Sequence, residues 1–278
     1  MKLNVLIVES SVRLGRCECL EDLWIAGDLR LLKIKFDEEA KLEATRLEAE
    51  SNLNIASSFF YDSFIFITFL NSRSLRKHIK DIMLDPELMK SSILGIAETH
   101  LHVDEEVQLE GFEGNFVNAG KGKGVAAFNK VTVNNVNKIC QPSFTAISLE
   151  MEKIKIVFAY MSSQINMEEV NLYLKPMLLE KKKPTIIMGD MNFHFSEKQN
   201  TFKCFLKDFG FHQLIEKVTH DEGHILDHIY VSDLDILSQE NLCLKPLYFS
   251  DHDALCIRFE KSYMQTNVEK SLQQLYIE

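Results

Sequence analysis

Short, continuous apolar runs dominate the hydrophobic pattern of this chain between residues 64 and 259. Runs of this length, bounded by Asn, Gly or charged residues, are typical of strands that are buried on both faces. They predict strands at residues 64–70, 91–97, 125–129, 146–151, 153–160, 185–188, 226–231 and 254–259.

Helical periodicity appears between some of these runs. Residues 72–90 carry apolar side chains at helical spacing, and residues 168–179 and 202–209 also suit helices. Residues 37–51 are rich in strong helix formers and predict a solvated surface helix. The order of elements predicts an α/β fold with a mixed sheet and external helices, and the strands are numerous enough for two packed sheets.

One buried run leads directly into a polar motif. Residues 184–195 read PTIIMGDMNFHF, so Gly189, Asp190 and Asn192 follow the apolar segment. We expect Gly189 to let the backbone turn. In extended geometry, residues i and i+2 point to the same side, so Asp190 and Asn192 would emerge together at the strand end. Taken alone, the motif fits a polar turn without chemistry equally well.

Polar groups of similar character finish other apolar runs. Asn71 follows the first run and Glu98 follows the second. Tyr160 ends a third run, and Asp251 and His252 follow the segment LYFS. Because a single polar strand end is routine but a set of this chemical type is not, the pattern predicts one sheet rim that carries a site.

Composition narrows the possible functions. The 278 residues suffice for one large domain or two small ones, and the hydrophobic (46%) and charged (26%) fractions are ordinary globular values. Thirty-one Lys and Arg against 41 Asp and Glu give a net charge of −10. This charge fits a passive nucleic-acid coat poorly, but it is compatible with an acidic site that holds a divalent cation.

Cysteine usage and hydropathy bear on the compartment. Only Cys17 and Cys19 of the six cysteines are close in sequence, and no second pair completes a zinc site with them. Scattered thiols indicate a reducing environment. The apolar run at the N-terminus breaks at Glu9, which is too early for a signal peptide, and polar residues interrupt residues 53–70. We expect a soluble intracellular protein, nuclear or cytoplasmic, with no membrane partner.

Seven short motifs follow one another in a characteristic order. They are LNSRSL at 70–75, AETHL at 97–101, GKGVAAF at 122–128, FAY at 158–160, GDMN at 189–192, ILDHIYVS at 225–232 and SDHDAL at 250–255. This ordered set resembles the endonuclease/exonuclease/phosphatase (deoxyribonuclease I-like) superfamily, and its wording is closest to endonuclease domains of non-LTR retrotransposons and other transposable elements. The resemblance covers about 200 of the 278 residues.

The resemblance implies a fold and a division of the chain. The fold would be a four-layered α/β sandwich, with two packed mixed β-sheets flanked by helices. Residues 63–262 would form the endonuclease/exonuclease/phosphatase domain. Residues 1–62 would be an N-terminal extension of unknown role outside this sandwich, and residues 263–278 a C-terminal tail.

The resemblance also implies a site for Mg²⁺, which Mn²⁺ could replace. Glu98 would be the principal ligand, and Asn71 would help to hold the metal and the carboxylate. Asp251 would lie at the metal edge or support its waters. Few protein ligands and several waters are what Mg²⁺ prefers. No residues for an organic cofactor are expected.

Five further residues have roles implied by the resemblance. Asp190 would orient and deprotonate the attacking water, and Asn192 would hold the scissile phosphate and the nucleophile in line. His252 would donate to a phosphate oxygen, with Asp227 holding its imidazole ring. Tyr160 would hydrogen-bond the phosphate or Asp190. A negatively charged transition state needs such fixed donors beside a cation and a positioned base.

Three functions remain open at the level of sequence. The first is a Mg²⁺-dependent endonuclease that nicks DNA, with nucleic acid as its substrate. The second is a phosphatase or phosphodiesterase acting on lipid or nucleotide phosphates, because this fold supports both chemistries. The third is a catalytically inactive binding remnant of a mobile element. Histidines near the motifs are expected to be surface or packing residues, namely His194, His220, His224 and His228.

Overall fold

The computed structural model describes residues 63–261, apart from residues 121, 180–182, 194–200 and 234–240. The predicted helix at 37–51, the N-terminal extension and the C-terminal tail therefore lie outside the described residues. None of the described helices is both long enough and apolar enough to cross a membrane.

Two six-stranded sheets form the centre of the domain. The first sheet has the order β11 (Leu242–Lys245), β12 (Ala254–Glu260), β1 (Phe64–Asn71), β2 (Ile93–Ala97), β4 (Val125–Asn129) and β3 (Glu113–Val117). The second has the order β5 (Asn135–Cys140), β6 (Phe144–Glu150), β7 (Lys155–Met161), β8 (Thr185–Asp190), β10 (Asp227–Ser232) and β9 (His212–Gln213). Both sheets are mixed, because β1 runs parallel to β2 and β7 runs parallel to β8.

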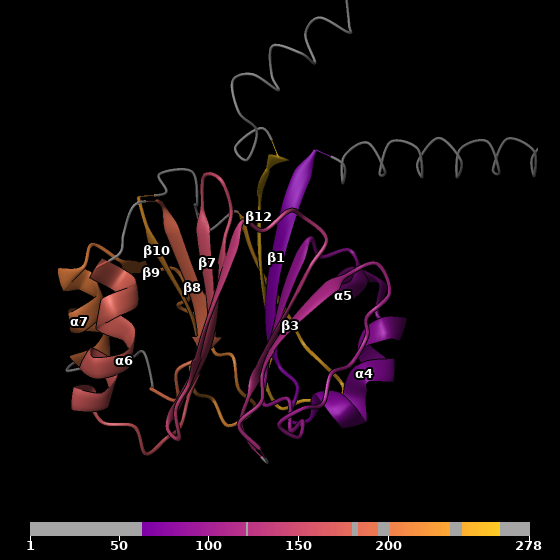
Figure 1. The fold of residues 1–278 in the computed structure, drawn as a ribbon, viewed down its shortest axis with the longest axis horizontal. Coiled ribbons are helices and arrows are strands. Elements are labelled where there is room, and N and C mark those ends of the chain that lie inside the picture. The colour runs from indigo at the N-terminus through magenta and orange to yellow at the C-terminus, as the bar shows by residue number, and fades with distance from the viewer. Residues whose placement is uncertain (1–62, 121, 180–182, 194–200, 234–240, 262–278) are drawn as a thin grey trace, which may run out of the picture. The chain divides into compact units, whose positions relative to one another are not determined.

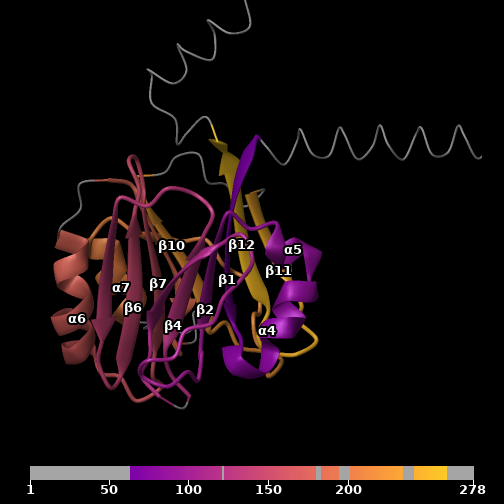
Figure 2. The same cartoon turned by 45° about the vertical axis from the view of Figure 1, so that its right-hand side comes forward.

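Helices cover the outer face of each sheet (Figures 1 and 2). The helices α4 (Leu75–Leu84) and α5 (Pro86–Met89) lie against the first sheet, and α6 (Met167–Leu179) and α7 (Thr201–Asp208) lie against the second. The predicted four-layered α/β sandwich is therefore confirmed.

Alternation along the strands builds three apolar layers. Ile67 and Phe69 of β1 face Phe158 of β7 in the core between the sheets. Leu70, the next residue of β1, packs instead with the α4 side chains Leu75 and Ile82. Successive strand residues point to opposite faces, so a strand between a helix layer and another sheet is apolar at most positions on both faces.

Each predicted strand is present, with ends shifted by at most two residues, and the predicted helices at 168–179 and 202–209 are confirmed. The single helix predicted at 72–90 is wrong, because the chain forms two helices that meet at Asp85. Pro86 lacks the N–H that a continuous helix needs. The Asp85 side chain accepts from the backbone N–H groups of Glu87 and Leu88 and caps the second helix.

Gly189 lies inside β8, so the expected turn at this residue is wrong. Its role is a close approach between strands. A Cβ atom at this position would lie 2.1 Å from the carbonyl oxygen of Ala159 in the neighbouring strand β7. Only glycine permits this spacing without displacing the backbone of one of the two strands.

Candidate active site

The predicted site residues gather at one rim of the two sheets. Asn71, Glu98 and Asp190 stand at or just beyond the carboxyl ends of β1, β2 and β8. Asp227 begins β10, which is antiparallel to β8, and His252 precedes β12, which is antiparallel to β1. The starts of β10 and β12 therefore lie at the same rim as the ends of β1 and β8.

Asn71 joins the two sheets through its buried side chain. Its Nδ2 donates to Glu98 Oε1 at 3.0 Å and to Asp190 Oδ2 at 3.0 Å. Its Oδ1 accepts from the backbone N–H of Arg73 at 3.0 Å. This network fixes the direction of the amide, so Asn71 acts as a donor to two carboxylates. The part of Asn71 in holding a metal stays a prediction.

Asp190 is buried beside other carboxylates. Burial raises its pKa, and the charges of Asp227 and Glu98 raise it further against the opposing effect of His252, to about 8. A carboxyl group with this pKa is mostly protonated at neutral pH in the absence of a cation, and once ionised it is a stronger base than an ordinary carboxylate.

Asn192 follows Asp190 in a tight polar turn. Its backbone N–H donates to Asp190 Oδ1 at 3.0 Å, and its Nδ2 donates to the Met161 carbonyl at 2.6 Å. The backbone of Asn192 is left-handed, with φ of 52°, so the expectation of extended geometry at this residue is wrong. Asn tolerates this conformation better than most residues because its side chain can bond locally.

His252 and Asp227 form a buried pair. The His252 Nδ1 donates to Asp227 Oδ2 at 2.7 Å. Burial lowers the pKa of His252, but the hydrogen bond and charge of Asp227, with Asp190 and Asp251, outweigh this effect and raise the pKa to about 9. The imidazole ring is therefore protonated at neutral pH, and its Nε2 can donate.

Tyr160 lies on β7 directly beside Asp190 in the parallel register of β7 and β8. Burial, followed by the nearby charges of Glu98 and Asp190, raises the pKa of its phenol. The hydroxyl stays protonated and makes no hydrogen bond to another residue in the described part of the chain. It is free to donate to a bound phosphate.

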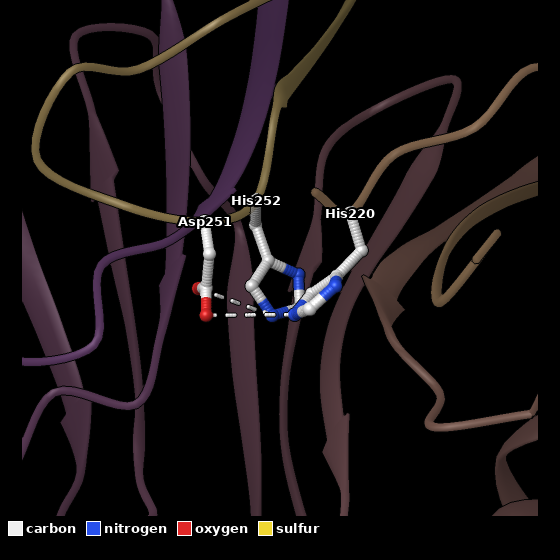
Figure 3. A group of neighbouring side chains, drawn as sticks. All are labelled: His220, Asp251 and His252. Atoms are coloured by element: carbon white, nitrogen blue, oxygen red, sulfur yellow. Dashed lines mark ion pairs between the residues drawn. The ribbon is translucent and has the colours of Figure 1, made fainter. Parts of the chain in front are cut away.

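Asp251 contacts three side chains, and Figure 3 shows two of them, His220 and His252. The Oδ2 atom of Asp251 accepts from Nη1 of Arg73 and lies 3.5 Å from Nε2 of His220. The Oδ1 atom lies 3.8 Å from Nε2 of His252. The rings of His220 and His252 meet edge-on, with centroids 4.6 Å apart. We expected His220 to be a surface or packing residue, yet it contacts two predicted site residues.

Sequence reasoning missed both Arg73 and His220 as neighbours of the site. Arg73 is two residues beyond β1, and His220 lies in the loop before β10. Neither terminates an apolar run, so the strand-end pattern could not select them. His228 does pack as expected, because it is buried and bonds to Tyr230 and the Ile225 carbonyl. His194 lies outside the described residues.

Left-handed backbone conformations recur around the rim. Arg73, Glu98 and Asn192 have φ values of 53°, 50° and 52°. For residues with a Cβ atom this conformation costs roughly 1–2 kcal/mol each. Such strain persists only where the surrounding structure fixes it, and it gathers at functional sites.

The donor set at the rim fits a hard divalent cation. The Glu98 carboxylate is 18% exposed and is held by Asn71. Asp190 and Asp227 add two buried carboxyl groups. His252 is the one cation in the set of Asn71, Glu98, Asp190, Asp227 and His252. Oxygen ligands and an excess of negative charge suit Mg²⁺ or Mn²⁺.

A second group of possible ligands fits a metal less well. Single ligand atoms of His220, Asp251 and His252 lie within 4.8 Å of one another. However, the backbone N–H of Glu222 donates to Nδ1 of His220 at 3.1 Å. The neutral ring must then carry its proton on Nε2, toward Asp251. His220 is therefore arranged as a donor to Asp251.

Comparisons with known proteins agree with this architecture. No model of a protein family matches the chain, and no curated protein matches it. Solved structures do match. The endonuclease domain of TRAS1, a telomere-specific non-LTR retrotransposon, aligns with a TM-score of 0.56 at 15% identity, over 70% of this chain and 98% of that one.

Two further structures give the same result. A single-residue variant of the 3′ phosphatase NExo from Neisseria, bound to a product DNA hairpin, aligns with a TM-score of 0.54 at 14% identity, over 69% of this chain and 98% of that one. An endonuclease/exonuclease/phosphatase family protein from Bacteroides thetaiotaomicron aligns with a TM-score of 0.53 at 14% identity, over 71% and 98%. At these identities the likeness shows the fold: the chain has the deoxyribonuclease I-like endonuclease/exonuclease/phosphatase fold.

Proposed function

We propose that the protein is a Mg²⁺-dependent phosphodiester hydrolase that nicks DNA. The observation that carries the proposal is the joining of two carboxylates, Glu98 and Asp190, by the amide of Asn71, next to the buried pair Asp227–His252. Glu98, Asp190 and His252 would supply a metal ligand, a base and a protonated donor at one rim. Hydrolysis of a phosphate ester requires these three functions together.

The chain's own groups have distinct parts in this reaction. Glu98, oriented by Asn71, would hold Mg²⁺, which when bound neutralises charge on the phosphate. Asp190, once ionised, accepts a proton from the attacking water, and the burial and neighbouring charges that raise its pKa make it a stronger base than an ordinary carboxylate. Asn192 positions the phosphate beside it.

His252 supplies the proton donor. Its Nδ1 is occupied by Asp227, so its Nε2 proton is the one available to a phosphate oxygen. The fixed ring direction matters, because a preorganised donor stabilises developing charge without reorganisation. Tyr160 can add a second donor, since its hydroxyl stays protonated.

The motifs favour DNA over other phosphate-containing substrates, because they resemble the motifs of transposon endonucleases. DNA is also favoured by the neighbouring structures, one of which is an endonuclease domain and another a complex with a DNA hairpin. The net charge of −10 opposes this choice modestly. A phosphatase acting on lipid or nucleotide phosphates and an inactive remnant are the competing outcomes.

The test is hydrolysis by the full chain of supercoiled plasmid, RNA, nucleotides and phospholipid, with Mg²⁺ and with chelator. We expect plasmid nicking that needs Mg²⁺ and falls about 10²- to 10⁴-fold in Asp190→Asn, which keeps the shape but removes the base. Asp104→Asn, at an exposed loop position, is the matched control and should retain full activity. Hydrolysis of phospholipid alone would make the protein a lipid phosphatase, and no hydrolysis would indicate an inactive remnant.

A further inference from the structure

A groove of about 650 Å³ adjoins the rim beside α4. Its lining includes Arg73 and Asp251, which also belong to the surroundings of His252. Tyr248 and Phe249, in the loop before β12, form another part of the lining. A ligand in this groove would therefore lie next to a phosphate held by His252.

Tyr248 is exposed and yet fixed in place. The residue is 77% exposed. Its hydroxyl donates to Asp81 Oδ1 at 2.7 Å, and its ring meets Phe249 edge-on with centroids 5.3 Å apart. Phe249 stacks on His78 at 5.1 Å, and Nδ1 of His78 lies 2.8 Å from Asp81 Oδ2. These four residues form a closed ring of contacts, which we call the Tyr248 platform.

The Tyr248 platform is tied to the catalytic rim by the short chain segment that follows it. Ser250 donates its hydroxyl to the Asn71 carbonyl at 2.7 Å and accepts the His252 backbone N–H at 3.2 Å. His252 lies only four residues beyond Tyr248, so the two are at most about 14 Å apart along the chain. The platform therefore has a defined position relative to the phosphate site, within reach of a neighbouring nucleotide.

The charges of the groove do not favour a phosphate chain. Arg73 and Lys77 are its two permanent cations, whereas Asp81, Asp221 and Asp251 are anionic. Arg73 is also already paired with Asp251. A polyanionic backbone needs a net positive path, which this groove lacks. A flat, uncharged ligand with an aromatic face suits an exposed, immobile tyrosine better.

We propose that the groove holds an unpaired nucleobase next to the scissile phosphate, with the base stacked on Tyr248. The inference rests on the proposed function and narrows it to a substrate class. A base inside a duplex is covered on both faces by its neighbours and must leave the stack to reach a protein ring. The preferred substrate is therefore nucleic acid that is single-stranded, distorted or flipped at the nucleotide beside the cleavage site.

Equilibrium binding tests the stacking directly. The probe is a single-stranded oligonucleotide carrying 2-aminopurine, titrated with the full chain in chelator so that no cleavage occurs. Tyr248→Ala should weaken its binding about 5- to 100-fold, the range for loss of one stacked base. Tyr248→Phe keeps the ring and should bind within about threefold of the natural protein. Leu172→Ala removes an exposed apolar side chain on α6 and is the matched control.

A blunt duplex of the same sequence and a single strand of the same length made of abasic residues, which have no ring to stack, complete the experiment. We expect Tyr248→Ala to affect the 2-aminopurine single strand at least fivefold more than either of these. Three results would overturn the proposal that a base stacks on Tyr248. They are equal losses of binding for all three probes, unchanged binding in Tyr248→Ala, and no binding of the oligonucleotide by the natural protein. Absence of hydrolysis alongside Tyr248-dependent binding would overturn only the proposed activity.

Discussion

Asn71 donates to Asp190 at 3.0 Å across the two sheets, although the residues are 119 positions apart in sequence. The same nitrogen also holds Glu98. One amide thus positions the carboxylate that would bind a metal and the carboxylate that would act as base. It also keeps two acidic groups close together with a donor between them, where they would otherwise repel.

Replacing Asn71 with Leu should therefore destabilise the fold as well as the site. A hydrogen bond to a charged group contributes about 1.5–3 kcal/mol and other hydrogen bonds about 1 kcal/mol. The variant loses the bonds to Glu98 and Asp190 and the one that Asn71 accepts from Arg73. We expect the free energy of unfolding, measured by urea denaturation, to fall by about 3 kcal/mol or more. Asn137→Ala, at an exposed position of the edge strand β5, should change it by less than about 0.5 kcal/mol. Equal stability of the two variants would show that the hydrogen bonds of Asn71 do not stabilise the contact between the two sheets.

Gly189→Ala tests the close approach of β7 and β8. The added Cβ atom would meet the Ala159 carbonyl oxygen at 2.1 Å, and this oxygen belongs to backbone that cannot rotate away. Overpacking of this kind costs typically about 1–3 kcal/mol. Gly95→Ala is a comparison, because there the clash at 2.1 Å is with the ring of Phe158, a side chain. Chemical denaturation should rank Gly189→Ala as the more damaging, and the reverse order would argue against a rigid backbone contact.

The buried strands could be predicted because most of their positions, on both faces, are apolar. The four strands that were not predicted are β3, β5, β9 and β11, which are the edges of the two sheets. The edge strand β5 reads NVNKIC and is largely exposed, so it has no continuous apolar run. An edge strand packs less side-chain surface and therefore leaves a weaker signal in the sequence.

The same distinction applies to the site. Asn71, Glu98 and Asp190 end buried strands, and this position marked them in the sequence. His220 and Tyr248 lie in loops, whose positions depend on contacts between distant segments and carry no periodic pattern. The left-handed turn at Asn192 could not be predicted from the sequence either, because the two-residue spacing of Asp190 and Asn192 fits extended and turned backbone equally well.

Lys245 provides a test of pH dependence away from the rim. Its Nζ lies 2.7 Å from Asp85, the residue that caps α5. Burial raises the pKa of Asp85, but Lys245 and the backbone N–H groups of Leu88 and Glu87 outweigh it and lower the pKa below the ordinary value. A carboxyl with a lowered folded-state pKa stabilises the fold above its unfolded-state pKa, and this stability is lost as pH falls through the folded-state pKa.

Lys245→Met should accordingly be less stable than the natural protein by about 1 kcal/mol at neutral pH, the upper range for a partly exposed ion pair. The difference should stay constant down to about pH 5 and shrink below about pH 4, where Asp85 becomes protonated. Urea denaturation at a series of pH values measures it. A difference that persists undiminished at about pH 3 would show that Lys245 stabilises the domain by packing, not by charge.

His220 supplies the last prediction, which depends on the proposed activity. Because the backbone N–H of Glu222 donates to Nδ1 of His220, the ring carries its proton on Nε2, which lies 3.5 Å from Oδ2 of Asp251. The ring also meets the ring of His252 edge-on. His220 should therefore position Asp251 and His252 without touching the substrate. A polar contact at 3.5 Å is worth about 1 kcal/mol, which is about a fivefold change, so His220→Ala should lower kcat for plasmid nicking about fivefold at saturating Mg²⁺. His220→Gln can still offer an N–H and should recover most of the loss, whereas the exposed control His102→Ala should match the natural protein. Equal rates in His220→Ala and the natural protein, or no recovery in His220→Gln, would exclude this positioning role.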